Sequence, residues 1–128
     1  MKYLFHKLLV ILILPFSIHA SDVYYCVDDE IVGFEPKENF AVSEYKPRKF
    51  KIMIDFEKDM VQSEDLYFLS HNDPKCIDDG YGVLICINSI GYSIAISKAD
   101  LKYYRGTMFN PVDPSDSVTV AHGSCEKF

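Results

Sequence analysis

Four cysteines and one histidine near the end of the chain are the residues best suited to chemistry. Cys26, Cys76, Cys86 and Cys125 all follow residue 20, and His122 stands three residues before the last of them. A Cys/His pair can act as a thiol nucleophile with its base, or supply half of a zinc site. However, the spacing matches no zinc-finger pattern. An even number of cysteines in a small exported domain indicates two disulfides.

The four cysteines allow three disulfide connectivities, and sequence alone does not choose among them. Hairpin geometry gives a preference. Cys76 and Cys86 flank a segment centred on a turn around Gly80, so they can face each other across a hairpin. Cys26 and Cys125 would then join the first strand to the last.

Motifs of the common enzyme classes are absent from the sequence. It contains no Gly-rich phosphate loop, no G-x-S-x-G, no H-E-x-x-H and no C-x-x-C. Acidic residues cluster at 28–30 and 78–79, but without the spacing of an EF-hand calcium loop. We therefore expect a protein that is not an enzyme, with no catalytic residue, metal or cofactor.

Tyrosines are the best candidates for a binding surface. Tyr24-Tyr25 and Tyr103-Tyr104 are adjacent pairs, so in a strand one ring of each pair faces inward and the other outward. Exposed tyrosines suit recognition because they join a rigid apolar ring to a hydroxyl group. With His122, these four tyrosines form the predicted binding surface. Ordinary packing within a sheet is the alternative.

The first twenty residues are typical of a secretory signal peptide. Lys2 and Lys7 precede an apolar run at 8–16, and Ala20 ends the segment. Nine apolar residues span only about 14 Å as a helix, too short for roughly 30 Å of membrane hydrocarbon. We expect a signal peptide at 1–20, a single β domain at 21–128, a periplasmic or secreted location, and no stable membrane insertion after cleavage.

The charge of the mature chain excludes some partners. Two of the 13 lysines and arginines lie in the signal segment, so 11 remain against 19 acidic residues, a net charge of −8. Nucleic acids and anionic membranes are bound through basic contacts to phosphate, which this charge disfavours. The composition, 48% hydrophobic and 25% charged, is that of a globular domain. The expected partner is a protein or a small ligand.

Alternation of apolar and polar residues with period two indicates strands. In 49–57, the side chains of Phe50, Ile52, Ile54 and Phe56 share one face and charged residues dominate the other. Further strands are predicted at 23–34 with a bulge near 28–30, and at 60–69, 82–87, 92–97, 101–109 and 117–125. The last of these strands has Val118 and Val120 on its predicted core face. The segment 35–48 is predicted to be a long connection between strands.

These strands predict an all-β fold. Seven or eight antiparallel strands in a meander would close as a small barrel or sandwich stapled by disulfides. Closure would place the first and last strands side by side, as a Cys26–Cys125 bridge requires.

Several segments together resemble small exported bacterial proteins that carry no assigned activity. The resemblance rests on Tyr24-Tyr-Cys26, Gly33-Phe34, Arg48-Lys-Phe50, Ile54-Asp-Phe56 and the sequence at 121–128. It spans most of the mature chain and implies no cofactor or site. In architecture, a small barrel with a cysteine near each end is also similar to the periplasmic inhibitors of C-type lysozyme. The chain lacks the Ser-Gly and Lys-containing pocket segment of those inhibitors, so this resemblance assigns no inhibitory residue.

Four functions are compatible with these features, the last of them a hydrolase without a recognisable motif. The first is an exported non-enzymatic β-barrel binding module. The second is an inhibitor of a basic cell-wall hydrolase, which the acidic charge would suit. The third is a lipocalin-like carrier of a small ligand, which requires an apolar cavity inside the barrel.

Overall fold

The computed structural model describes residues 21–66, 74–89, 91–107 and 118–128, which form one antiparallel sheet. The strands are β1 (Asp22–Glu35), β2 (Ala41–Tyr45), β3 (Lys49–Asp55), β4 (Met60–Gln62), β5 (Lys75–Asp78), β6 (Val83–Ile87), β7 (Tyr92–Ser97), β8 (Lys102–Thr107) and β9 (Val118–Lys127). A short 3-10 turn, η1 (Pro36–Glu38), follows β1. The predicted signal peptide and the strand residues expected at 67–69 and 108–109 lie outside the described residues.

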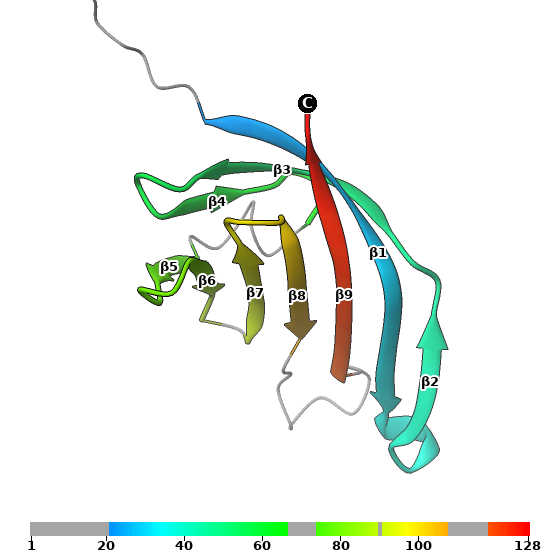
Figure 1. Cartoon of the computed structure of the whole chain (residues 1–128). Helices are drawn as coiled ribbons and strands as arrows, with labels where there is room; N and C mark the ends of the chain where they lie inside the picture. The colour runs from blue at the N-terminus through cyan, green and yellow to red at the C-terminus, as the bar shows by residue number, and fades with distance from the viewer. Residues whose placement is uncertain (1–20, 67–73, 90, 108–117) are drawn as a thin grey trace, which may run out of the picture.

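The sheet curls until it is nearly closed into a barrel, as Figure 1 shows. Its strands follow the order β4-β3-β1-β9-β8-β7-β6-β5, and β2 pairs with the second half of β1. The predicted all-β antiparallel fold is thus confirmed. The first and last strands, β1 and β9, lie side by side as expected. They pair in the middle of the sheet, however, and the two strands that face the remaining gap are β4 and β5.

Inward-facing side chains fill the part of the interior that the described strands enclose. Phe50, Ile52 and Ile54 of β3 are buried as predicted, and Phe56 packs against them at the edge of the core. Each of the following core residues has at most 5% of its surface exposed: Tyr24, Cys26, Phe50, Ile52, Ile54, Val61, Leu66, Leu84, Cys86, Ile94, Ile96, Tyr103 and Cys125. A water-sized void beside these residues would expose them, so they pack against one another.

Both disulfides join residues that lie directly opposite each other in the sheet. Cys26 on β1 is bonded to Cys125 on β9, and Cys76 on β5 is bonded to Cys86 on β6. This confirms the preferred connectivity among the three possible ones. The first bridge links residues 99 positions apart and ties the two ends of the domain together, whereas the second closes a hairpin of sequence separation 10.

The segment 35–48 contains a strand that the sequence did not indicate. β2 pairs with β1 from Ile31 to Glu35, because β1 extends far beyond the end of β3. No residue of β2 is buried, so its side chains show no apolar alternation. Its half-buried face carries Ser43 and Tyr45 and its exposed face carries Val42 and Glu44, so the sequence shows no apolar periodicity.

β4 is shorter than the predicted strand at 60–69. Beyond Gln62, side chains replace the backbone ladder beside β3: Ser63 Oγ donates to the carbonyl of Lys51, and Asp65 Oδ2 accepts from the Lys51 N–H at 2.6 Å. The chain therefore leaves the ladder while the edge of β3 stays hydrogen-bonded.

The prediction that Val118 and Val120 face the core is wrong. Ala121, Gly123 and Cys125 are the buried residues of β9, and Val120 lies on the outer face. The register with β1 places Cys125 opposite the buried Cys26, and a period of two then turns the even-numbered residues outward.

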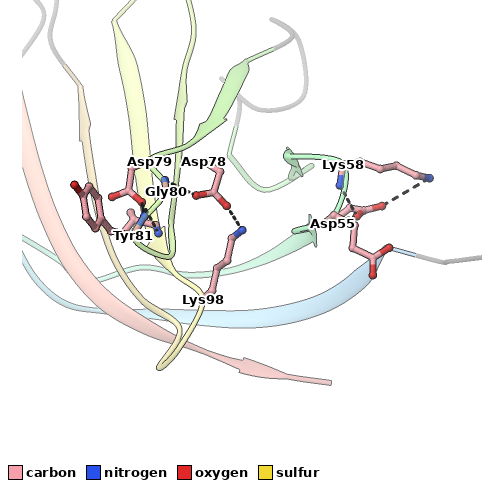
Figure 2. A network of polar contacts seen from close by, with 9 residues as sticks. Asp55, Lys58, Asp78, Asp79, Gly80, Tyr81 and Lys98 are labelled. Carbon is pink, nitrogen blue, oxygen red and sulfur yellow. Dashed lines mark hydrogen bonds and ion pairs between the residues drawn. The ribbon is translucent and has the colours of Figure 1, made fainter.

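Lys98, in the turn after β7, connects the two sides of the gap between β4 and β5. Its ammonium group donates to Asp78 at the end of β5, a contact visible in Figure 2. The same nitrogen lies 5.7 Å from the ring centroid of Phe56, in the turn between β3 and β4. The hydrogen bond lowers the pKa of Asp78 and raises that of Lys98. One cation thus contacts groups on both sides of the gap at this end of the barrel.

Candidate functional site

A row of outward-facing side chains crosses three adjacent strands in the middle of the sheet. Tyr104 on β8 pairs with His122 on β9, and His122 pairs with Glu30 on β1. The ring centroids of Tyr104 and His122 lie 6.4 Å apart. His122 Nδ1 lies 3.5 Å from Asp29 Oδ2, and its Nε2 lies 3.6 Å from Glu30 Oε2. Asp29, Glu30, Tyr104 and His122 form what we term the bulge patch.

A β-bulge turns two consecutive carboxylates to the same face of β1. The register between β1 and β9 shifts between Asp28 and Glu30, where the sequence predicted a bulge. Asp28 and Ile31 point into the core, whereas the side chains of Asp29 and Glu30 are 62% and 61% exposed. In an uninterrupted strand, one of two neighbouring side chains would point inward. The bulge therefore creates the carboxylate pair beside His122.

A buried ionic network lies beneath the bulge. Arg105 donates from Nε to Asp28 Oδ1 at 2.9 Å and from Nη2 to Oδ2 at 2.6 Å. Tyr103 Oη donates to Oδ1 at 2.7 Å, and the backbone N–H of Arg48 donates to Oδ2 at 2.9 Å. The side chain of Asp28 is fully buried. Because each carboxylate oxygen accepts two hydrogen bonds, the network fixes the backbone at the bulge.

Gly123 makes this network possible. It stands in register between Tyr103 on β8 and Asp28 on β1. A Cβ atom at Gly123 would lie 2.1 Å from the carbonyl oxygen of Val27 and 2.6 Å from Tyr103 Oη. Only glycine lets the tyrosine hydroxyl pass across β9 to reach the carboxylate on β1.

The network holds fixed charges and does not exchange protons near neutral pH. Burial alone would raise the pKa of the Asp28 carboxyl, but the hydrogen bonds from Arg105, Tyr103 and Arg48 outweigh it and lower that pKa below its ordinary value. Burial and the hydrogen bond to Asp28 raise the pKa of the Tyr103 hydroxyl. Asp28 therefore stays ionised and Tyr103 protonated, so their contribution is to position the bulge.

The bulge patch offers groups that bind cations. Two exposed carboxylates can pair with an ammonium or guanidinium group, and the ring of Tyr104, 67% exposed, offers an apolar face that also attracts cations. Within the described parts of the chain, no three His, Cys, Asp or Glu side chains are arranged to hold a metal ion.

The structure divides the five residues of the predicted binding surface. Tyr24 and Tyr103 are buried, so they contribute to the core and cannot contact a partner. Tyr25, Tyr104 and His122 face solvent. Tyr104 and His122 are neighbours, but the ring of Tyr25 packs against another aromatic ring at the end of β9. The predicted surface thus separates into the bulge patch and a second aromatic cluster.

Asp29 and Glu30 were not predicted as binding residues. The acidic run at 28–30 and the bulge are both visible in the sequence, but His122 is about ninety positions away along the chain. Only the pairing of β1 with β9 shows that the two carboxylates flank its ring. The ion pair between Asp28 and Arg105 could not be predicted either, because the two residues are 77 positions apart in the sequence.

Comparisons of this chain with protein families, curated proteins and solved structures found no match. They therefore place it in no enzyme family. No helix in the described residues is both long and apolar enough to cross a membrane.

Proposed function

We propose that this protein is an exported, non-enzymatic β-barrel module that binds a basic protein partner through the bulge patch. Export is supported by the N-terminal segment and by two disulfides that use all four cysteines, because such bridges persist in oxidising compartments. The proposed location is the periplasm or the extracellular space.

The observation that carries this proposal is an exposed aromatic ring and two carboxylates that flank His122 on a rigid sheet, the ring on one side and the carboxylates on the other. The buried network around Asp28 fixes the bulge, and the Cys26–Cys125 bridge crosses the same pair of strands. Groups held in place before binding lose little conformational entropy when a partner docks. The arrangement suits an arginine or lysine side chain that stacks on Tyr104 and pairs with Asp29 or Glu30.

The close packing of the core residues that the structure describes supports surface binding more than carriage of a small ligand. The core residues that would line a barrel cavity pack against one another. A carrier instead needs an enclosed apolar space of roughly 300–1,000 Å³.

The test is a titration of the disulfide-bonded protein with an arginine-rich peptide and an acidic peptide of equal length. We expect only the basic peptide to bind, with an affinity that falls as salt increases. Tyr104→Ala and the double variant Asp29→Asn/Glu30→Gln should each weaken binding about tenfold.

A matched control separates the patch from the overall negative charge. Glu38→Gln/Glu44→Gln removes two exposed carboxylates from another part of the surface and should leave the affinity nearly unchanged. If this control weakens binding as much as Asp29→Asn/Glu30→Gln does, the attraction is general and the bulge patch is not the site.

Inhibition of a basic cell-wall hydrolase is a narrower form of the same function. The single sign of charge on the bulge patch favours it, because such a surface complements a basic enzyme. C-type lysozyme activity, titrated with the wild-type protein and with Tyr104→Ala, decides between the two. If lysozyme activity is unchanged at micromolar concentrations of the protein, the protein binds a basic partner but does not inhibit this enzyme.

A further inference from the structure

His122 is the member of the bulge patch whose charge changes in mild acid. Histidine ordinarily gains its proton as the pH falls from about 8 to about 5, whereas carboxyl groups gain theirs only near a pH of about 4. The side chain of His122 is 48% exposed, so the ring exchanges protons with solvent. In mild acid the patch therefore keeps its two negative charges and acquires one positive charge between them.

Each nitrogen atom of the imidazole faces a different carboxylate. His122 Nδ1 lies 3.5 Å from Asp29 Oδ2, and Nε2 lies 3.6 Å from Glu30 Oε2. A neutral imidazole carries hydrogen on only one nitrogen, whereas the protonated ring donates from both. Closing each distance by less than about 1 Å would make two charge-assisted hydrogen bonds. The protonated ring can therefore engage both carboxylates at once.

The other neighbours of the ring offer no comparable contact. On β8, the ring of Tyr104 lies on the opposite side of His122, with 6.4 Å between the centroids. Lys102, the next outward residue of β8, forms an ion pair with Asp100 at 3.7 Å. On β9 the two nearest outward residues are uncharged, and Glu126 is four positions away. Among the described residues, only the two carboxylates of β1 are in ion-pair contact with the imidazole.

The proposed position of the partner's cation crosses this ring. Tyr104 and Glu30 pair with His122 from the two neighbouring strands, so a side chain that contacts both must pass over the imidazole. A neutral imidazole presents an uncharged surface to that side chain. An imidazolium repels a second cation and also occupies the carboxylates that would pair with it. Protonation therefore opposes the partner both by repulsion and by competition.

We propose that His122 makes binding of the basic partner depend on pH, because the neutral ring permits binding and the protonated ring opposes it. The pH dependence rests on the proposed function, since it requires that the bulge patch binds a cationic side chain. Protonation changes the net charge of the patch from −2 to −1, so the attraction is reduced and not abolished. The dissociation constant should rise about three- to tenfold between a pH of about 7.5 and a pH of about 5.5.

Titration of the disulfide-bonded protein with the arginine-rich peptide at both pH values tests the proposal. Arginine stays charged throughout, so the peptide itself does not change. His122→Asn keeps a polar side chain without a charge and should bind with nearly the same affinity at both pH values. His122→Lys fixes a positive charge at this position and should bind weakly at both. Far-ultraviolet circular dichroism at each pH shows whether the variants remain folded.

His71→Asn is the matched control. His71 is the other histidine that follows residue 20, and it lies outside the described residues. The control removes the same kind of titratable group from the chain and should keep the full pH dependence of the wild-type protein. If His71→Asn loses the pH dependence and His122→Asn keeps it, the proton acts away from the bulge patch and the proposal is overturned.

The outcomes distinguish the pH dependence from the binding itself. If the wild-type protein binds the arginine-rich peptide at neither pH, both the proposed function and the role of His122 are wrong. Equal affinity of the wild-type protein at both pH values would overturn the role of His122 alone. The same holds if His122→Lys binds at neutral pH as tightly as the wild-type protein, because a fixed positive charge would then not compete with the partner.

Discussion

Replacing Arg105 by methionine would leave the carboxylate of Asp28 buried without its counter-ion. The two side chains are 8% and 0% exposed, and Arg105 supplies two of the four hydrogen bonds to the carboxylate. Breaking a buried ion pair from one side costs about 3–5 kcal/mol. That is a large part of the roughly 5–15 kcal/mol by which domains are normally stable. Methionine keeps most of the apolar length of arginine, so the effect comes mainly from the lost charge and its two hydrogen bonds.

The loss of stability in Arg105→Met should depend on pH. In the wild-type protein the pKa of Asp28 lies below its unfolded value, despite burial, because of its hydrogen bonds. Its contribution is therefore present above a pH of about 4 and is lost as the pH falls through the folded pKa. In the variant, burial dominates and the folded pKa rises, so the ionised carboxylate destabilises the fold near neutral pH and protonation relieves it. The difference between the two proteins should begin to shrink as the pH falls through the raised pKa of the variant, and it should be smallest below the folded pKa of Asp28 in the wild-type protein.

Urea denaturation followed by far-ultraviolet circular dichroism measures the difference in unfolding free energy between the two proteins. It is made once at neutral pH and once below a pH of about 4. Lys102→Met on the same strand is the control, because Lys102 lies in an exposed ion pair with Asp100 that contributes little. A loss below about 1 kcal/mol at neutral pH would show that Asp28 is not held by Arg105 as described. An equal loss at both pH values would refute the linkage.

Three further variants test the architecture. Gly123→Ala should destabilise the protein severely and shift the tyrosine near-ultraviolet dichroism, because the new Cβ would displace the Tyr103 hydroxyl; an unchanged urea midpoint would contradict this. Lys98→Met should increase hydrogen exchange in the turns beside β4 and β5 and leave β1 and β9 protected, whereas uniform protection would show that the lysine does not connect the edges. Replacing both Cys26 and Cys125 by alanine should cost about 4–5 kcal/mol, against about 2–3 for the shorter bridge; equal losses would show that loop length does not govern the effect.

The bulge relates the core to the proposed binding surface. Asp28 points inward to Arg105, whereas Asp29 and Glu30 point outward to His122, and one register shift produces both arrangements. Arg105→Met should therefore weaken binding of the arginine-rich peptide even under conditions where the variant remains folded. Unchanged peptide affinity in the folded variant would show that the buried network does not position the bulge patch.

Local alternation in the sequence predicted much of the fold correctly. Phe50, Ile52 and Ile54 share a buried face as their spacing indicates, and the bulge near 28–30 lies where expected. The prediction failed at β2, which has no buried residue, and at β9, where Ala121, Gly123 and Cys125 are buried and the valines lie on the outer face.

The sequence by itself determined that the chain is an all-β domain, which residues can be bonded as cystines, and that one tyrosine of each pair points inward. The strands and the inward tyrosines depend on neighbours along the chain, because successive side chains of a strand point to opposite faces, and the candidate cystines depend only on which residues are cysteines. The tertiary structure decided that Asp29, Glu30, Tyr104 and His122 form one patch and that Gly123 admits the hydroxyl of Tyr103. Those contacts depend on the register between distant strands, and a shift of one residue would turn each side chain to the other face.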